Sequence, residues 1–297
     1  MTSEISTLLS DIKPDQPVLI AGPTASGKSA LALHIAEQQG GVIVNADALQ
    51  VFDCWQLLSA RPDDADLARA PHALYGHVSY LDSYSTGQWL RDLEPLLTGA
   101  RRPIIVGGTG LNFTALTEGL AEIPPITQDV RQLSDAMSTM ERLQDLVCRD
   151  PKTAARIDLD NPARVQRAWE VLQVTGRPLA DWQDATPPPR LKRKDCTTIV
   201  LDAPKAWLSP RIETRFDLML KKGALEEVRA LSDDWNPDRP SARAIGAREL
   251  MDYLKGHCEL EAARNAAIIA SRQYAKRQRT WFASRMSDWT RIQAAAL

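Results

Sequence analysis

The sequence of 297 residues contains few cysteines, few histidines and no long apolar run. Its four cysteines, Cys54, Cys148, Cys196 and Cys258, form no CxxC pair, which predicts buried, reduced thiols rather than disulfides or zinc ligands. The four histidines show no metal-ligand spacing. No stretch approaches the roughly 20 apolar residues of a membrane-spanning helix, and the N-terminal segment MTSEISTLLSDIKPDQ lacks the basic and apolar parts of a signal peptide. We therefore expect a cytoplasmic protein without a membrane segment.

The sequence also lacks an excess of charge of either sign. Its 36 basic and 38 acidic residues give a net charge of −2, which excludes a wholly basic nucleic-acid-binding protein but leaves room for a local basic groove. With 44% hydrophobic and 25% charged residues, the composition is that of an ordinary globular protein. The length suffices for one large domain or two.

Three continuous apolar runs, 18–21, 42–44 and 103–106, predict buried strands. A helical pattern over 28–38 separates the first two, and 197–201 reads as a later strand of the same sheet. Continuous rather than alternating apolar residues favour a parallel sheet covered on both faces. Glycine or polar residues follow each of the first three runs, where open α/β sheets bind ligands.

The octapeptide GPTASGKS satisfies the pattern GxxxxGK[ST] and lies between a predicted strand and a predicted helix, as a phosphate-binding loop requires. Backbone N–H groups and the helix N-terminus would hold phosphate oxygens. Lys28 would neutralise phosphate charge and Ser29 would bind Mg²⁺. The predicted phosphate-binding residues are Gly22, Pro23, Thr24, Ala25, Ser26, Gly27, Lys28 and Ser29. This loop is typical of ATP-binding proteins, but alone it does not distinguish a triphosphate from a diphosphate.

A second part of the chain differs in character. Segment 129–183 is helical and charged, and Asn161 followed by a proline is typical of a helix start. We predict an α/β fold: a P-loop NTPase-like parallel-sheet core flanked by helices, with a small all-helical insertion domain. The predicted boundaries are 1–122 for the first part of the core, 123–190 for the insertion and 191–297 for the second part of the core.

Two further stretches stand at predicted strand ends. Asp47 and Gln50 follow the second strand, where an acid assists Mg²⁺ or activates a hydroxyl, or simply caps a turn. The segment GGTG at 107–110 is a second candidate, or only a tight turn. These residues leave open a P-loop kinase that uses ATP to phosphorylate a small metabolite or nucleotide. They also leave open a non-catalytic RNA-binding protein with an unused phosphate loop.

Several motifs together resemble one family, the tRNA dimethylallyltransferases or tRNA isopentenyltransferases. The resemblance covers nearly the whole chain and rests on GPTASGKS, NADALQVF, PIIVGGTGLNF, DPKTAARIDLDNPARVQRAWEVLQVTG, AIGARELMDYLKG and RQYAKRQRTWF, in this order. It implies that the loop holds the diphosphate of dimethylallyl diphosphate. The dimethylallyl group would pass to the exocyclic N6 of the adenosine immediately 3′ of the anticodon. The implied partners are dimethylallyl diphosphate, Mg²⁺ and the anticodon stem-loop of tRNA, with the chain acting as a monomer.

The resemblance also implies roles for single residues. Asp47 matches the general base, Thr109 the threonine near the reacting groups, and Arg215 the arginine that stabilises the departing diphosphate. The implied tRNA-binding residues are Asp47, Ala48, Leu49, Gln50, Thr109, Arg131, Ala163, Arg164, Val165, Gln166, Arg167, Arg272, Lys276, Arg277 and Arg279. Gln50 is suited to bidentate hydrogen bonding with adenine.

The chain departs from the family pattern at four places: Ala48 replaces a serine, Asn112 a tyrosine and Ala163 a glutamine, and the stretch 54–62 differs at most of its positions. In the C-terminal segment the spacing of Arg272, Lys276 and Arg279 places three cations on one predicted helix face, as a phosphate-contacting surface requires. Tyr274, Trp281 and Phe282 lie among them and would stack or pack.

Overall fold

The computed structural model describes residue 10 and residues 12–297. These form two compact units. The first, which we term the core unit, comprises the chain up to Thr117 together with Arg190–Leu297. The second, the helical unit, comprises Glu118–Pro189.

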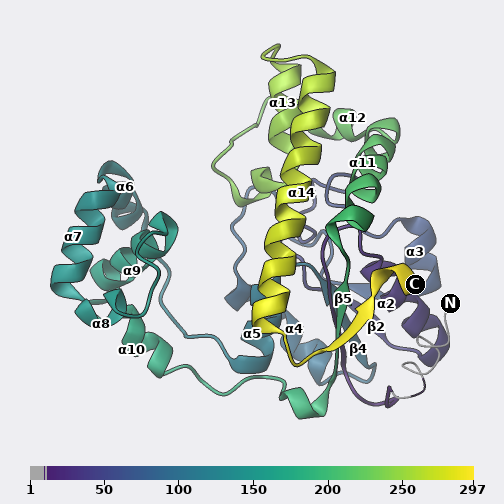
Figure 1. Cartoon of the computed structure of the whole chain (residues 1–297), viewed down its shortest axis with the longest axis horizontal. Coiled ribbons are helices and arrows are strands. Elements are labelled where there is room, and N and C mark those ends of the chain that lie inside the picture. Colours follow the sequence, from purple (N-terminus) through teal and green to yellow (C-terminus); the bar gives the residue numbers. More distant parts are fainter. Residues whose placement is uncertain (1–9, 11) are drawn as a thin grey trace. The chain divides into compact units, whose positions relative to one another are not determined.

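A six-stranded sheet in the order β3-β2-β4-β1-β5-β6 forms the centre of the core unit (Figure 1). Its neighbouring strands all pair in parallel, which confirms the predicted fold class. Every residue of β1, β2 and β4 is buried, as their continuous apolar sequences require. The strands are β1 (Val18–Ala21), β2 (Val42–Asn45), β3 (His72–Ala73), β4 (Pro103–Gly107), β5 (Thr197–Asp202) and β6 (Thr290–Gln293).

Helices cover this sheet and extend beyond it. In Figure 1 the long helix α14 runs in front of the core unit, and α11 runs beside it. One buried cluster joins the strands to α2, α11 and α14, and a second joins α11–α14 to the segment after β2. The helices of this unit are α2 (Lys28–Gln39), α3 (Asp64–Arg69), α4 (Thr86–Leu97), α5 (Gly110–Glu118), α11 (Lys205–Lys221), α12 (Ala224–Arg229), α13 (Ala247–Leu254) and α14 (Leu260–Arg285), with short 3-10 helices at Arg193–Asp195, Pro240–Arg243 and Ala294–Ala296.

The helical unit is built from five helices around a small core of its own. Leu146, Val165 and Trp169 lie in this core. The predicted helix start is present, because the Asn161 side chain accepts hydrogen bonds from two backbone N–H groups of the first turn. The helices are α6 (Gln128–Ala136), α7 (Thr139–Arg149), α8 (Pro151–Ala154), α9 (Pro162–Thr175) and α10 (Leu179–Asp184).

The cysteines are free thiols, as predicted, but they are not uniformly buried. Cys196 is buried, Cys54 and Cys258 are half-buried, and Cys148 on α7 is exposed. Among the helices that the structure describes, none is long and apolar enough to cross a membrane.

Candidate active site

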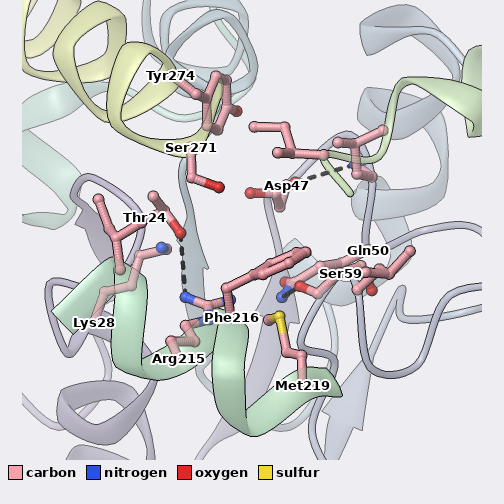
Figure 2. A pocket seen from close by; sticks show the side chains of 14 residues that line it. Thr24, Lys28, Asp47, Gln50, Ser59, Arg215, Phe216, Met219, Ser271 and Tyr274 are labelled. Atoms are coloured by element: carbon pink, nitrogen blue, oxygen red, sulfur yellow. Dashed lines mark hydrogen bonds between the residues drawn. The ribbon is translucent and has the colours of Figure 1, made fainter. Parts of the chain in front are cut away.

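Three loops meet where parallel strands end. The phosphate loop follows β1, the segment with Asp47 follows β2, and the GGTG segment follows β4, which pairs with both other strands. Helices α11 and α14 complete a cavity of about 80 Å³ (Figure 2). Its lining residues are Thr24, Lys28, Asp47, Leu49, Gln50, Leu58, Ser59, Ile212, Arg215, Phe216, Met219, Ile245, Ser271 and Tyr274.

The phosphate loop has the compact shape that its glycines permit. Gly27, the residue before α2, has φ of 91°, a left-handed conformation that glycine adopts without strain. Gly22 leaves no space for a side chain, because a Cβ there would lie 2.8 Å from Ser26 Oγ. Lys28 Nζ donates to Pro23 O across the loop at 3.4 Å. The lysine is therefore held over the loop whose N–H groups would bind phosphate.

Helix α11 contributes two arginines to this loop. Arg215 Nη1 donates to Thr24 Oγ1 at 3.1 Å, and Arg211 Nε donates to Ala25 O at 3.2 Å. Figure 2 shows Lys28, Thr24 and Arg215 together on one side of the cavity. Arginine suits this place because its planar guanidinium stays charged and donates to two oxygens at once.

The charges in the cavity favour an anion. Burial lowers the pKa of Lys28 from 10.5 to about 8, which the Asp47 carboxylate partly opposes and Arg215 reinforces. Burial likewise lowers the pKa of Arg215, again opposed by Asp47. Two cations are thus held close together with partial desolvation and a single nearby carboxylate. A bound polyanion such as a diphosphate would stabilise both charged forms.

Asp47 is fixed by the buried amide of Asn45. Asn45 Oδ1 accepts from the Asp47 backbone N–H at 2.8 Å, and Asn45 Nδ2 donates to Asp47 O and to Leu74 O, each at 3.0 Å. The Asp47 carboxylate accepts from Leu49 N at 3.0 Å through Oδ1. Figure 2 shows the carboxylate directed into the cavity. The sequence analysis did not predict this role of Asn45.

Thr109 joins the Asp47 segment to α14. Its hydroxyl accepts from Ala48 N at 2.9 Å and is hydrogen-bonded to Tyr274. Burial, and secondly the Asp47 carboxylate, raises the pKa of Tyr274 well above its usual range. Tyr274 therefore stays neutral and is unsuited to act as the base. Among the residues that line the cavity, Asp47 carries the carboxylate and is therefore the candidate for the base.

Gln50 lines the cavity but uses its amide within the protein. Its Nε2 donates to Ser59 O and to Ala60 O, both at 2.9 Å. In this arrangement both N–H bonds are engaged, so only Oε1 is left to accept a hydrogen bond from a base. The bidentate contact with adenine that the sequence suggested does not fit this arrangement.

The divergent stretch 54–62 is anchored by a residue that the sequence analysis missed. The Glu227 carboxylate on α12 accepts from the consecutive backbone N–H groups of Gln56, Leu57 and Leu58. Trp55 is buried, and its indole Nε1 donates to Ser241 O at 2.8 Å. Asn112 is likewise structural, since it is buried and accepts from Thr86 Oγ1 at 2.9 Å.

The remaining wall of the cavity is apolar. It is formed by Leu49, Leu58, Ile212, Phe216, Met219 and Ile245. Figure 2 shows Phe216 and Met219 from α11 between the cations and Gln50. A ligand with a small hydrocarbon group would place that group against this wall. Its anionic end would then meet Lys28 and Arg215.

The donor set for a divalent cation is small. Ser29, the predicted Mg²⁺ ligand, is exposed at the start of α2. Within residue 10 and residues 12–297, no group of three or more histidine, cysteine, aspartate or glutamate side chains is placed to hold a metal. The Ser29 hydroxyl is a single protein oxygen, and Mg²⁺ is commonly held by one or two protein oxygens together with substrate phosphates and water.

In the helical unit, one residue of the predicted RNA-contacting segment has no exposed side chain. Val165 is completely buried on α9 and packs in the core of the unit, so its side chain does not reach a ligand. Ala163 and Gln166 are on the same helix, and Gln166 Nε2 donates to Asp135 Oδ1 at 2.9 Å and to Glu170 Oε1 at 3.0 Å.

The three predicted arginines of this unit are differently placed. The Arg131 side chain is exposed and its Nε lies 3.3 Å from the buried Glu170 carboxylate. Arg164 is exposed and lies 3.9 Å from Asp158. Burial lowers the pKa of Arg167. Arg164 thus has a longer and more exposed ion pair than Arg131.

The cations of α14 do share one face, but it is not the face of the reaction cavity. Arg272, Lys276 and Arg279 line a second cavity of about 800 Å³, together with Lys205 and Arg291. Arg272 is already paired with Glu213 at 2.9 Å. On the other side, the Arg277 guanidinium lies 5.7 Å from the Tyr274 ring centroid. Phe282 is buried and packs rather than stacks on a base.

Comparison with known protein families agrees with this geometry. Residues 50–285 match the family model described as IPP transferase, and residues 16–74 match one described as isopentenyl transferase. The chain belongs to the IPP transferase family. The first match covers more than half of the chain and contains the cavity residues Arg215 and Tyr274, and the second contains the phosphate loop and Asp47.

Relatives within the IPP transferase family are similar over nearly the full length. A tRNA dimethylallyltransferase of Ruegeria sp. (strain TM1040) is 60% identical over 96% of this chain and 98% of its own. That of Dinoroseobacter shibae is 62% identical over 96% of this chain and 97% of its own. The crystal structure of a full-length tRNA isopentenylpyrophosphate transferase from Bacillus halodurans is 29% identical, with a TM-score of 0.68 over 94% of this chain and 90% of that one.

Proposed function

We propose that this IPP transferase family member is a tRNA dimethylallyltransferase. It transfers the dimethylallyl group of dimethylallyl diphosphate to the exocyclic N6 of the adenosine immediately 3′ of the anticodon. The observation that carries the proposal is a single cavity lined by two cations, Lys28 and Arg215, by the Asp47 carboxylate and by an apolar wall. An anionic leaving group, a hydrocarbon group and an amine that must lose a proton each find a matching side chain there.

The donor diphosphate would bind the phosphate loop, with Lys28 and Arg215 opposite its oxygens. As the reaction proceeds, the bond between C1 of the dimethylallyl group and the diphosphate oxygen breaks, and negative charge grows on the leaving diphosphate. Fixed cations and loop N–H groups stabilise that charge where it develops. Arg215 is positioned for this by its hydrogen bond to Thr24.

The acceptor nitrogen is weak because its lone pair is conjugated with the purine ring. Asp47 would take the N6 proton as the N6–C1 bond forms, so that the products are the alkylated adenosine and diphosphate. The backbone contacts from Asn45 hold Asp47 at the cavity without involving its carboxylate. Thr109, bonded to the Asp47 segment and to Tyr274, keeps this side of the cavity in place. The adenine must leave its stack to enter such a cavity.

Mg²⁺ would be held by Ser29 and the donor diphosphate, and when bound it supplies further neutralisation of the phosphate charge. The tRNA would contact Lys276 and Arg279 of the core unit and Arg164 of the helical unit. Because the enzyme's acceptor is a cytoplasmic RNA, the enzyme would act in the cytoplasm. It would act as a monomer.

A labelled-donor assay tests the proposed function. Dimethylallyl diphosphate labelled in the dimethylallyl group is mixed with an anticodon stem-loop and Mg²⁺ in ATP-free buffer, and a parallel reaction contains ATP labelled in the γ-phosphate instead. We expect label on the RNA from the first donor and none on RNA, metabolites or nucleotides from the second. Transfer of the γ-phosphate with no transfer of the dimethylallyl group would overturn the proposal in favour of a kinase.

A further inference from the structure

One face of α14 contacts the GGTG segment residue by residue. Tyr274, Gln278 and Trp281 are spaced by four and three positions, so they share a helix face. Tyr274 hydrogen-bonds Thr109, and Gln278 donates to Gly108 O. A Cβ on Gly110 would lie 2.2 Å from the Trp281 ring. The GGTG segment is therefore shaped to receive this face of α14.

Gln278 makes the most specific of these contacts. It is 5% exposed, and both ends of its amide are used. Nε2 donates to Gly108 O at 2.9 Å, and Oε1 accepts from Thr24 N at 2.9 Å. One buried side chain thus joins the phosphate loop to the loop after β4.

The space around Gln278 explains Gly108. A Cβ on Gly108 would lie 2.2 Å from Gln278 Nε2 and 3.2 Å from Asp47 Oδ2. The φ of Gly108 is not in the left-handed region, so its conformation does not require glycine. Glycine is required because the amide and the carboxylate both approach this point. Gln278 therefore lies beside the segment that carries the base as well as the loop that holds the donor.

We propose that Gln278 is a positioning residue for the transfer step, an inference that rests on the proposed function. By holding Thr24 and Gly108 at a fixed separation, it sets the distance between the donor carbon and the nitrogen activated by Asp47. A misplacement of about 1 Å in such a geometry costs about 10² in rate. Gln278 acts through its hydrogen bonds to the backbones of Thr24 and Gly108, rather than on the side chains of Lys28, Arg215 and Asp47.

The first test compares Gln278→Ala with Gln273→Ala. Gln273 is exposed on the same helix, lines the second cavity rather than the reaction cavity, and provides a matched loss of one amide, so kcat is measured at saturating tRNA. For Gln278→Ala we expect kcat to fall about 10²-fold, with a smaller change in KM for the donor and unchanged affinity for tRNA. For Gln273→Ala we expect kcat close to wild type. Equal kcat for both variants would overturn the inference, whereas a wild-type enzyme without transfer activity would overturn the proposed function instead.

The second test uses Gln278→Glu and does not depend on the alanine variant folding. A protonated carboxyl reproduces the amide pattern, since its O–H donates to Gly108 O and its C=O accepts from Thr24 N–H. The ionised form has lost the donor and places a carboxylate oxygen against the Gly108 carbonyl. Burial raises the pKa of a carboxyl, so the ratio of variant to wild-type kcat should rise as pH falls from about 9 to about 6. A ratio that is constant with pH would contradict a positioning role.

A double-mutant cycle with Gly108→Ala completes the design. The added methyl group collides with Gln278 Nε2, which Gln278→Ala removes, while Asp47 Oδ2, 3.2 Å away, must still shift by a few tenths of an ångström. We expect Gly108→Ala to reduce kcat strongly in the wild-type background and less in the Gln278→Ala background. Additive effects would show that the two residues do not act through this contact.

Discussion

The lowered pKa of Lys28 predicts that donor binding depends on pH. Burial lowers this pKa from 10.5 to about 8 in the donor-free enzyme. The charged lysine is the form that binds diphosphate, so a bound donor requires the proton that the free enzyme loses above pH 8. Affinity for dimethylallyl diphosphate should therefore be constant at lower pH and fall as the pH rises through 8.

The size of the effect follows from that value. With a pKa of about 8, Lys28 is nearly fully charged at pH 7 and about one-tenth charged at pH 9, so donor affinity should fall about tenfold between them. The same lowered pKa changes the stability of the folded chain in the opposite direction: stability rises with pH where donor affinity falls. The unfolded chain binds the Lys28 proton more tightly, so the contribution of Lys28 to stability is lowest below pH 8 and increases from pH 8 to 10.5.

Equilibrium dialysis of the donor with the enzyme, without tRNA and at constant Mg²⁺, measures this dependence. Lys28→Arg is the matched variant, because arginine stays charged throughout this range and should remove the pH dependence. Lys28→Met removes the charge and should bind weakly at every pH. A wild-type affinity that is flat between pH 7 and 9, or an equal slope in Lys28→Arg, would refute the reasoning.

Three further predictions concern the base, the divergent loop and the basic face. Asp47→Asn keeps the shape of the side chain and should reduce kcat about 10²-fold or more with unchanged tRNA affinity; near-wild-type turnover in single-turnover kinetics would remove Asp47 from the role of base. Glu227→Ala leaves three backbone N–H groups without their acceptor and should lower the free energy of unfolding by about 3 kcal/mol in urea titrations, whereas Glu227→Gln should lose less. Replacing Arg272, Lys276 and Arg279 together with alanine should weaken tRNA binding and flatten its salt dependence by about one unit of slope per lost phosphate contact, with Lys276 and Arg279 contributing more than Arg272, which is paired with Glu213. A salt slope equal to wild type in filter binding would show that this face does not contact phosphate.

The sheet was predictable where strands are buried on both faces. The predicted run 18–21 coincides with β1, and the runs at 42–44, 103–106 and 197–201 each fall one residue short of β2, β4 and β5. The two edge strands were missed. β3 has only two residues, and in β6 three of four residues are exposed, so neither leaves a continuous apolar run in the sequence.

The candidate site was predictable where a local motif carries the chemistry, as at Lys28 and Asp47. The contacts that hold these residues in place were not. Gln278 lies in a basic helical segment, and no local pattern shows that its amide is buried against Thr24 and Gly108. Glu227 likewise acts on a loop far away in the chain. Such contacts depend on how distant segments pack, which periodicity and spacing do not encode.

Mass analysis of the nucleosides from an anticodon stem-loop, after reaction with dimethylallyl diphosphate and Mg²⁺ in ATP-free buffer, tests the central claim most directly. We predict one added dimethylallyl group on N6 of the adenosine immediately 3′ of the anticodon, formed by the wild-type enzyme and reduced about 10²-fold or more in initial rate with Asp47→Asn. An unmodified adenosine at that position, or a group added elsewhere on the RNA, would contradict the account.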